Sequence, residues 1–295
     1  MSRGLGDVYK RQGKDNRYKF VNNNTIINMK KKAITISIIN NKGGVGKTMT
    51  VQNLSAALAE REEMVCMIDL DSQHNLTNRC ENLGREEEEL RICKYEGCAI
   101  EDYLANPEIP IRPLMIKKNL FLIPSTIRLA ELSASLYSMN IGERPSDKLK
   151  DLCNDIQNKF DFIIIDSEPG MSALMANAAK AADIIIIPIN CQDALSGAGE
   201  GVFGIMDNNN LDTPHYFLQT MFENRLKSSR DIRSKLTEEA YENRFYTIIK
   251  RNEHLNIAGN LGLDVFEHAP KSGGASDFKD LAAEILSIIK RGNKK

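Results

Sequence analysis

The chain has 295 residues, of which 42% are hydrophobic, enough to build the core of one large α/β domain or of two small ones. Its formal net charge is −1, so the molecule as a whole carries no positive field that would attract nucleic acid. No run of 18 apolar residues occurs, so we expect no membrane-spanning helix. Any contact with DNA or with a lipid surface must therefore come from a local patch.

The first 28 residues are predicted to lie outside the folded domain. They are polar, have no apolar periodicity and lack the apolar segment of a signal peptide. The opening SRGLGDVYKRQ resembles a translated sequencing-adapter read-through, and Met29 would be a natural start. We expect residues 1–28 to be a disordered, non-native extension and residues 29–295 to form a single domain.

A glycine-rich loop between a strand and a helix organises the rest of the chain. The apolar, β-branched residues 34–39 predict a strand, three glycines follow, and the apolar spacing in residues 48–60 predicts a helix. A loop of this kind directs backbone N–H groups at a polyphosphate. Lys47 would then supply positive charge near the β- and γ-phosphates, and the Thr48 hydroxyl would be a ligand for Mg²⁺. The alternative is a glycine-rich turn whose lysines are merely solvated.

The glycine loop departs from the usual G-x-x-x-x-G-K-[ST] pattern, because Asn41 stands where the first glycine belongs and Lys42 precedes Gly43. The sequence KGGVGKT resembles the deviant Walker A motif of the ParA/MinD group of P-loop ATPases. That resemblance implies that Lys42 reaches across a nucleotide-sandwiched homodimer to the phosphates bound by the partner subunit. The loop residues that it implies for binding ATP are Lys42, Gly43, Gly44, Val45, Gly46, Lys47, Thr48 and Met49.

Two aspartates lie at the end of the next predicted strand, residues 64–70. Ligands bind at the carboxyl ends of the strands in open parallel sheets, so Asp69 and Asp71 are expected beside the phosphate loop. The segment resembles the D-x-D-P-Q-x-N signature of ParA proteins, with Ser72 in place of the proline and His74 in place of the usual glycine. The resemblance implies that Asp71 positions or activates the attacking water and that Asp69 shapes the site and the Mg²⁺ shell. The alternative is a strand-end turn with solvated carboxylates.

The segment between these aspartates and the next motif is less informative. Residues 119–124 predict a strand, Ser125 is expected to cap a helix through Met139, and residues 146–159 predict an amphipathic helix. The stretch NLFLIPSTIRLAELSASL again resembles ParA proteins. One group of potential metal ligands fits no zinc spacing, so no zinc site is expected at His74, Cys80, Cys93 and Cys98.

A third aspartate ends the apolar run FDFIIID, residues 160–166, which is typical of a Walker B strand. Asp166 would hold Mg²⁺ opposite Thr48. The ParA family usually continues D-C-P-P, whereas this chain reads D-S-E-P and places Glu168 near the γ-phosphate side. That added negative charge leaves nucleotide binding expected but puts the rate of hydrolysis in doubt. A buried strand that happens to end in aspartate is the alternative.

A basic segment begins after the strand predicted over 216–222. Before it, helices are expected over 173–182 and 197–207 and a strand over 183–189. Arg230 and Arg233 lie on one face of the helix predicted over 228–241. In ParA relatives, basic residues here bind DNA non-specifically through its phosphates, and Arg225 in TMFENR is the best-matched contact. The alternative is a solvated helix face.

Residues 245–249 predict another strand, which ends in the sequence K-R-N. The ParA family usually has P-R-N here, and the resemblance implies that Asn252 reads the edge of adenine. Lys250 replaces the proline, and His254 stands where relatives often carry a DNA-facing arginine, which weakens the prediction of DNA binding. Residues 276–290 predict the last helix.

The alternation of strands and helices from residue 34 onward predicts the fold class: α/β, a P-loop NTPase with a mostly parallel central sheet and helices on both faces. The ParA resemblance covers about residues 33–290, with three phosphate-site motifs in the family's order. It implies a Mg²⁺-dependent ATPase of plasmid or chromosome partitioning that dimerises on ATP and binds DNA non-specifically. It also implies a ParB-like centromere-binding partner and a cytoplasmic protein that associates with the nucleoid when ATP is bound.

Two alternatives remain open. A MinD-like, membrane-associated positioning ATPase would use the last helix, where Lys290 and Arg291 follow an apolar face. Asp277 and Glu284 within that helix argue against this, so no membrane contact is expected. The second alternative, motivated by Glu168, is a switch that binds ATP but barely hydrolyses it. Relatives of the nitrogenase iron protein are disfavoured, because suitably placed cluster cysteines are lacking.

Overall fold

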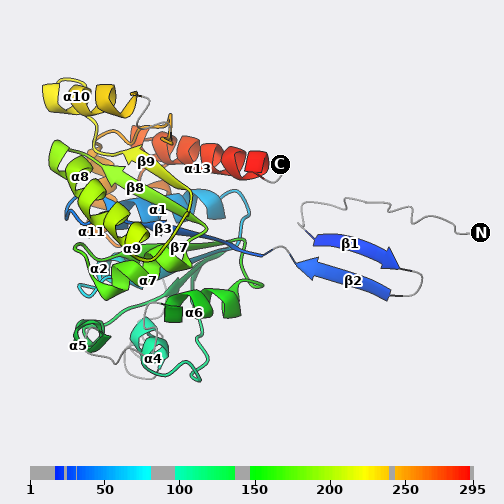
Figure 1. Cartoon of the computed structure of the whole chain (residues 1–295). Coiled ribbons are helices and arrows are strands. Elements are labelled where there is room, and N and C mark those ends of the chain that lie inside the picture. Colours follow the sequence, from blue (N-terminus) through cyan, green and yellow to red (C-terminus); the bar gives the residue numbers. More distant parts are fainter. Residues whose placement is uncertain are drawn as a thin grey trace, which may run out of the picture.

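The computed structural model describes residues 17–22, 25–30, 32–80, 97–136, 147–238 and 243–292. Cys93 and the expected ends of two helices, at 137–139 and 239–241, lie outside this range. In the described part, a central sheet lies between two layers of helices (Figure 1).

The central sheet has seven strands in the order β5-β6-β4-β7-β3-β8-β9. These are β3 (Ile34–Ile38), β4 (Val65–Leu70), β5 (Leu114–Lys117), β6 (Leu120–Ile123), β7 (Phe162–Ser167), β8 (Ile184–Ile189) and β9 (His215–Gln219). Neighbouring strands pair in parallel, except that β5 pairs antiparallel to β6. The predicted α/β fold with a mostly parallel sheet is confirmed.

The central strands are apolar on both faces, and successive side chains enter two different cores. In β7, Ile163 and Ile165 belong to one buried cluster, whereas Phe162 and Ile164 belong to the other. A strand covered by helices on both sides therefore reads as a continuous apolar run instead of alternating with polar residues.

Each face of the sheet is covered by its own group of helices. The face that carries Phe162 and Ile164 is covered by α1 (Lys47–Ala59), α2 (Asn75–Cys80), α11 (Glu253–Asn260), α12 (Val265–His268) and α13 (Gly273–Gly292). The opposite face is covered by α4 (Ile100–Ala105), α5 (Arg128–Leu136), α6 (Lys148–Ile156), α7 (Ala173–Ala181), α8 (Gln192–Gly197), the π-helix Ala198–Phe203, α9 (Gly204–Asn208) and α10 (Lys227–Leu236). Helix α1 is buried along almost its whole length, which fixes its N-terminus relative to the sheet.

The strand predicted over residues 245–249 does not form. Isolated bridges at Arg244 and Lys250 flank the segment, and within it the N–H groups of Phe245 and Ile249 donate to carbonyl oxygens of β9. In its middle, the Glu284 carboxylate of α13 accepts hydrogen bonds from the backbone N–H groups of Tyr246 and Thr247, at 2.8 and 2.9 Å. These side-chain bonds take the place of a strand ladder, so the apolar sequence alone predicted the wrong element.

Other boundaries also differ from the sequence-based prediction, which lacks α2, β5, α11 and α12. Helix α5 begins at Arg128 and not at Ser125, because the Ser125 hydroxyl donates to the Asp71 carbonyl (3.1 Å) and does not cap the helix. The helix predicted over 197–207 begins at Gln192 and includes the π-helix.

A separate hairpin precedes the sheet. Strands β1 (Arg17–Asn22) and β2 (Thr25–Lys30) pair antiparallel and lie apart from the main body in Figure 1. Their aromatic and β-branched content favours strand pairing, and the expectation of disorder over residues 1–28 stays a prediction. That residues 1–28 are a non-native extension stays a prediction.

Candidate functional site

The glycine loop lies at the carboxyl end of β3, between the ends of β7 and β8 in the sheet order. Gly44 and Gly46 have positive φ angles of 73° and 87°, and Gly46 is the N-cap of α1. This left-handed backbone is accessible to glycine at little cost and turns the chain from strand to helix. The loop therefore presents the N-terminus of a buried helix at a strand-end edge, the position that suits a bound phosphate.

The Lys47 ammonium lies inside the loop. It donates to the carbonyl oxygens of Asn40 (3.0 Å) and Lys42 (3.2 Å), and the residue is buried. Burial lowers the pKa of Lys47, while the charges of Asp166 and Asp71 act in the opposite direction. The lysine is thus held beside the two aspartates that the sequence assigned to the same site.

Asp166 lies near the end of β7, where its side chain is buried and makes no hydrogen bond within the described structure. Its carboxylate is fully buried, and neither oxygen has a hydrogen-bond partner among the described residues. Burial raises its pKa well above the ordinary range, and the neighbouring Asp69 raises it further. The nearby Thr48 hydroxyl acts to lower the pKa of Asp166, although it makes no well-formed hydrogen bond to the carboxylate.

This arrangement fits a divalent cation. The burial of the Asp166 carboxylate without a hydrogen-bond partner in the described structure is energetically costly. This carboxylate lies beside the Thr48 hydroxyl at the N-terminus of α1. Both groups are oxygen donors of the kind that Mg²⁺ prefers when it also contacts phosphates. In the described ranges, three or more His, Cys, Asp or Glu side chains nowhere gather into a metal-binding group, and the absence of a zinc site stays a prediction; Cys93 lies outside these ranges.

Asp69 holds the turn after β4. Its Oδ1 accepts from the Asp71 N–H (3.1 Å), and its Oδ2 accepts from the Thr77 N–H (2.8 Å) and hydroxyl (2.7 Å). Burial raises its pKa to about 6, although these hydrogen bonds act to lower it. Both oxygens are therefore used in positioning Asp71 and α2. The role of Asp69 in the Mg²⁺ shell stays a prediction.

Asp71 is oriented by its own turn. Its Oδ1 accepts from the Gln73 N–H and its Oδ2 from the Asn75 side-chain amide, both at 2.9 Å. His74, which stands where ParA relatives carry glycine, adopts the left-handed φ of 44° that glycine would adopt at lower cost. Asp71 is only 4% exposed and electrostatically close to Lys47.

Lys42 differs from Lys47 because it points outward. Its side chain is 49% exposed, and its ammonium lies 3.7 Å from an Asp193 carboxylate oxygen on α8. The preceding residue, Asn41, packs against α8. A Cβ added at Gly197 of that helix would lie 2.4 Å from the Asn41 Oδ1. The loop that carries Lys42 therefore packs on α8, and the Lys42 ammonium stays accessible to solvent.

Two further residues flank the site. Asn252 is the N-cap of α11, and its Oδ1 accepts from the His254 N–H (2.9 Å), so its assignment to adenine stays a prediction. Glu168 is buried just beyond the end of β7, two residues after Asp166.

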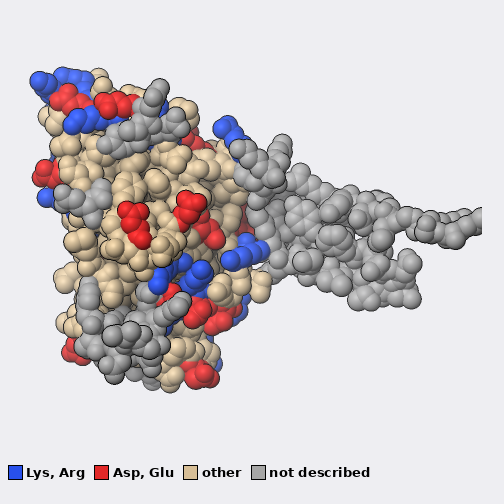
Figure 2. All heavy atoms as spheres, in the orientation of Figure 1, with Lys and Arg blue, Asp and Glu red and all other residues tan. Residues whose placement is uncertain are grey.

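The predicted DNA-binding arginines differ in their partners and exposure, and their role in DNA binding stays a prediction. Arg225 pairs with Glu223 (2.8 Å), Arg230 donates to the Asn224 carbonyl, and Arg233 is half-buried. Burial lowers the pKa of Arg233, and Arg244 lowers it further. Figure 2 shows basic and acidic side chains side by side around α10, so this face is not uniformly positive.

Arg251 joins this region, although the sequence did not suggest it. It pairs with the same Glu223 carboxylate at 2.9 Å, so one acid lies between Arg225 and Arg251. The alternation of charges in the sequence gives no sign of this pairing, because residues 223 and 251 meet only through the fold.

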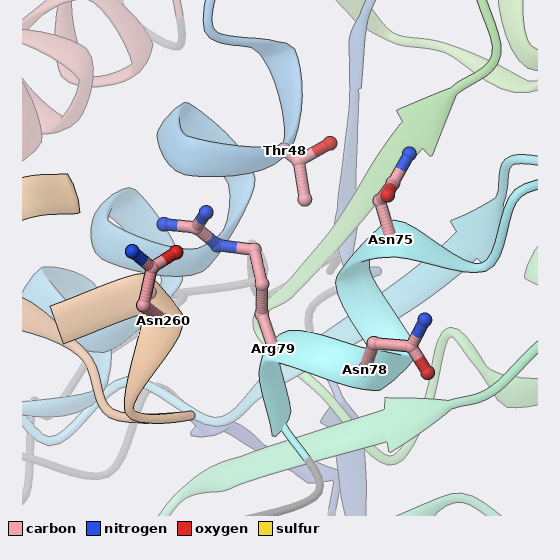
Figure 3. A pocket seen from close by; sticks show the side chains of 6 residues that line it. Thr48, Asn75, Asn78, Arg79 and Asn260 are labelled. Atoms are coloured by element: carbon pink, nitrogen blue, oxygen red, sulfur yellow. The ribbon is translucent and has the colours of Figure 1, made fainter. Parts of the chain in front are cut away.

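A polar pocket adjoins the loop. Its volume is about 390 Å³, and it lies between α1, α2 and α11 (Figure 3). Its lining residues are Thr48, Asn75, Asn78, Arg79, Gly259 and Asn260. Sequence reasoning assigned only Thr48 to the site, because the others belong to helices that the fold brings to α1.

Comparison with known proteins agrees with this geometry. A family model described as an AAA domain matches residues 33–209. The sporulation initiation inhibitor protein Soj of Bacillus subtilis is 32% identical over 260 residues, which cover 85% of this chain and 98% of that protein. The chain belongs to the Soj/ParA family of P-loop ATPases.

Other members and structures agree with this family assignment. The chromosome-partitioning ATPase Soj of Treponema pallidum is 29% identical over 264 residues, covering 86% of this chain and 97% of that protein. The structure of a plasmid partition protein from Borrelia burgdorferi bound to AMPPNP has a TM-score of 0.72 at 24% identity, covering 87% of this chain and 99% of that one. The family resemblance read from the motifs is confirmed, and the Borrelia protein shares the fold.

Proposed function

We propose that this Soj/ParA family member is a Mg²⁺-dependent ATPase of DNA segregation, which dimerises on ATP and then binds DNA non-specifically. The observation that carries the proposal is the buried Asp166 carboxylate, which has no hydrogen-bond partner in the described structure and lies near the Thr48 hydroxyl and the Lys47 ammonium. This set of groups suits a Mg²⁺-nucleotide complex. The name of the Treponema relative, a chromosome-partitioning ATPase, supports the biological role.

In this proposal Thr48 and Asp166 hold the Mg²⁺ ion, which would neutralise charge on the β- and γ-phosphates. Lys47 leaves the carbonyls of Asn40 and Lys42 to contact the phosphates, where its charge stabilises the transition state. The backbone N–H groups of the loop bind phosphate oxygens at the positive end of α1.

Asp71 is proposed to orient the attacking water. Its carboxylate is held by Gln73 and Asn75, and the turn itself is held by Asp69. Water would attack the γ-phosphorus in line as the bond to the ADP oxygen breaks, giving ADP and inorganic phosphate. A carboxylate that is already fixed needs little reorganisation when the reaction begins.

Lys42 is proposed to act across the dimer. Among the described residues its exposed ammonium has one weak partner, Asp193, which it could exchange for the phosphates bound by a second subunit. DNA would then bind through basic residues including Arg225, Arg230 and Arg233, and a ParB-like partner would stimulate hydrolysis.

ATP turnover with Mg²⁺ tests the enzymatic part. We expect Lys47→Ala to remove nearly all turnover, whereas Lys159→Ala, an exposed lysine after α6, leaves it unchanged. Turnover that is equal in Lys47→Ala and wild type would overturn the proposal. Co-sedimentation with DNA in ATP, in ADP and without nucleotide, over a salt series, tests the DNA-binding part, because contacts to phosphates weaken steeply with salt.

The binding-only switch is the second candidate, and the buried Glu168 beside the site supports it. Single-turnover hydrolysis separates this switch from an enzyme. The MinD-like alternative has less support, because α13 buries Phe278, Leu281 and Ile285 in the core. None of the helices in the described ranges is long and apolar enough to cross a membrane.

A further inference from the structure

Arg79 is a cation in the pocket beside Thr48 that the proposed chemistry does not use. It comes from α2, and its Nε donates to the Gln52 side-chain oxygen (3.0 Å) and its Nη2 to the Leu255 carbonyl (3.4 Å). Both partners are neutral. No carboxylate in the described structure lies within ion-pair distance of it, although Arg79 is partly buried. Within the described ranges, the guanidinium is therefore held in place without a counterion.

The space for this guanidinium exists because residue 259 is glycine. A Cβ at that position would lie 1.8 Å from Nη2 and 2.0 Å from Cζ of Arg79. Glycine inside α11 disfavours the helix by about 1 kcal/mol relative to alanine, so the fit is made at a cost in helix propensity. Figure 3 shows the guanidinium reaching from α2 toward Asn260 on α11, across the flank of α1.

An anion in the pocket would offset the cost of this cation. Arginine stays protonated in proteins, and desolvation of a charge without a partner is unfavourable. Burial lowers the pKa of Arg79, and the charges of Cys80 and Asp166 act to raise it; Mg²⁺ would neutralise the negative charge of Asp166. Once the metal is bound, the pocket becomes more positive and its preference for an anion increases.

We propose that Arg79, with the carboxamide of Asn260, forms a binding site for a phosphate group beside Thr48. The proposal rests on the proposed function, because Thr48 is shared with the nucleotide site. The planar guanidinium and the amide N–H groups are donors that match phosphate oxygens. A volume of about 390 Å³ holds such a group with its surroundings. The phosphate belongs either to the bound nucleotide or to the inorganic phosphate that hydrolysis releases.

Occupancy of this pocket would act on the water-orienting aspartate. Asn75 also lines the pocket, and its amide donates to the Asp71 Oδ2 at 2.9 Å. A phosphate that engages Asn75 competes for that amide and changes how Asp71 is held. The site is therefore expected to couple phosphate occupancy to hydrolysis.

Two variants separate the charge of Arg79 from its position. Arg79→Gln removes the charge, whereas Gly259→Ala keeps the charge and displaces the guanidinium, with a helix propensity that favours folding. The matched control is Arg61→Gln, an exposed arginine after α1 that donates to the Lys279 carbonyl. Thermal unfolding confirms that each variant is folded before binding is measured.

Binding is measured directly by calorimetry, with three probes: ADP with Mg²⁺, a non-hydrolysable ATP analogue with Mg²⁺, and inorganic phosphate alone. A lost charge-assisted contact should weaken binding about 10-fold or more in both Arg79→Gln and Gly259→Ala. Weaker binding of the nucleotides identifies the phosphate as part of the nucleotide. Weaker binding of inorganic phosphate alone identifies the product.

Equal affinities for all three probes in wild type and both variants would overturn the site. Wild-type protein that binds inorganic phosphate through Arg79 but binds no nucleotide would overturn the proposed function and leave the site intact. If the wild-type protein hydrolyses ATP and both variants bind all three probes with wild-type affinity, the proposed function would stand and the site would be overturned.

Discussion

Asp69 and Asp166 lie opposite each other in the parallel pairing of β4 and β7, and both are fully buried. Burial raises the pKa of both carboxyl groups; the charge of Asp69 raises that of Asp166 further, and the charge of Asp71 adds to the rise at Asp69. Asp69 has three hydrogen-bond donors, whereas Asp166 has none in the described structure. The energetic cost of the pair is therefore concentrated at Asp166.

Asp166→Asn tests this cost. A raised pKa means that the folded protein keeps a proton that the unfolded chain has lost, so unfolding becomes easier as pH rises through this range. Without metal, the variant should be more stable than wild type by about 1–3 kcal/mol at pH 8, and the difference should shrink toward pH 4. Urea unfolding at several pH values measures it. A variant less stable than wild type at pH 8 would contradict this account.

Mg²⁺ should reverse the order of stability. Ionised carboxylates bind the metal, so protons compete with it, and stabilisation by Mg²⁺ with ADP should grow from pH 5.5 to pH 8 in the wild type. Asp166→Asn should lose most of that stabilisation. The measurement is the midpoint of thermal unfolding with and without Mg²⁺ and ADP. A gain that is independent of pH would argue against a carboxylate in the metal site.

The backbone of the loop gives a second prediction. Gly46 has a φ of 87°, and a Cβ there would lie 3.1 Å from the Met49 methyl carbon, so Gly46→Ala should lower the free energy of unfolding by about 1–2 kcal/mol and weaken nucleotide binding. Gly204→Ala is the matched control, because Gly204 is helical and has open space around it. The control should be neutral or up to about 1 kcal/mol more stable. Equal stability of Gly46→Ala and wild type would remove the argument for strain.

Most of the candidate site could be predicted from sequence because each of its parts follows a local sequence signal. The loop, Asp71 and Asp166 each follow an apolar strand, and parallel strands bring their carboxyl ends together. Arg79 could not be predicted in this way, since its position depends on Gln52, Leu255 and the missing Cβ of Gly259.

The same distinction applies to the fold. The continuous apolar runs of β7 and β8 predict their strands, because helices cover both faces. The segment 245–249 is also largely apolar, but the Glu284 carboxylate, from a helix about 40 residues further along the chain, accepts the backbone N–H groups of Tyr246 and Thr247. A side chain that competes with a ladder leaves no local signal in the sequence.

Lys42 gives a third prediction. Its ion pair with Asp193 is exposed, so Asp193→Ala should change the free energy of unfolding by less than about 0.5 kcal/mol. Lys42→Ala should still bind ATP but should lose the ATP-dependent dimer, whereas Asp193→Ala should keep it. Light scattering after gel filtration with a non-hydrolysable ATP analogue measures the mass. A dimer that forms equally well in Lys42→Ala would show that this lysine does not act across the interface.

Glu223 gives the last prediction. Its carboxylate binds both Arg225 and Arg251, and these contacts lower the pKa of Glu223, with the hydrogen bond from Arg225 as the largest cause. Glu223→Gln removes the negative charge, so both guanidinium groups become more available to DNA phosphates. In the ATP-bound state, DNA affinity should rise, and the slope of its logarithm against the logarithm of salt concentration should steepen by about one to two. Arg225→Gln should change both quantities in the opposite direction. Glu108→Gln, an exposed acid after α4, is the control and should leave both unchanged. If Glu223→Gln and Arg225→Gln both bind DNA as wild type does, the phosphate contacts lie elsewhere on the protein.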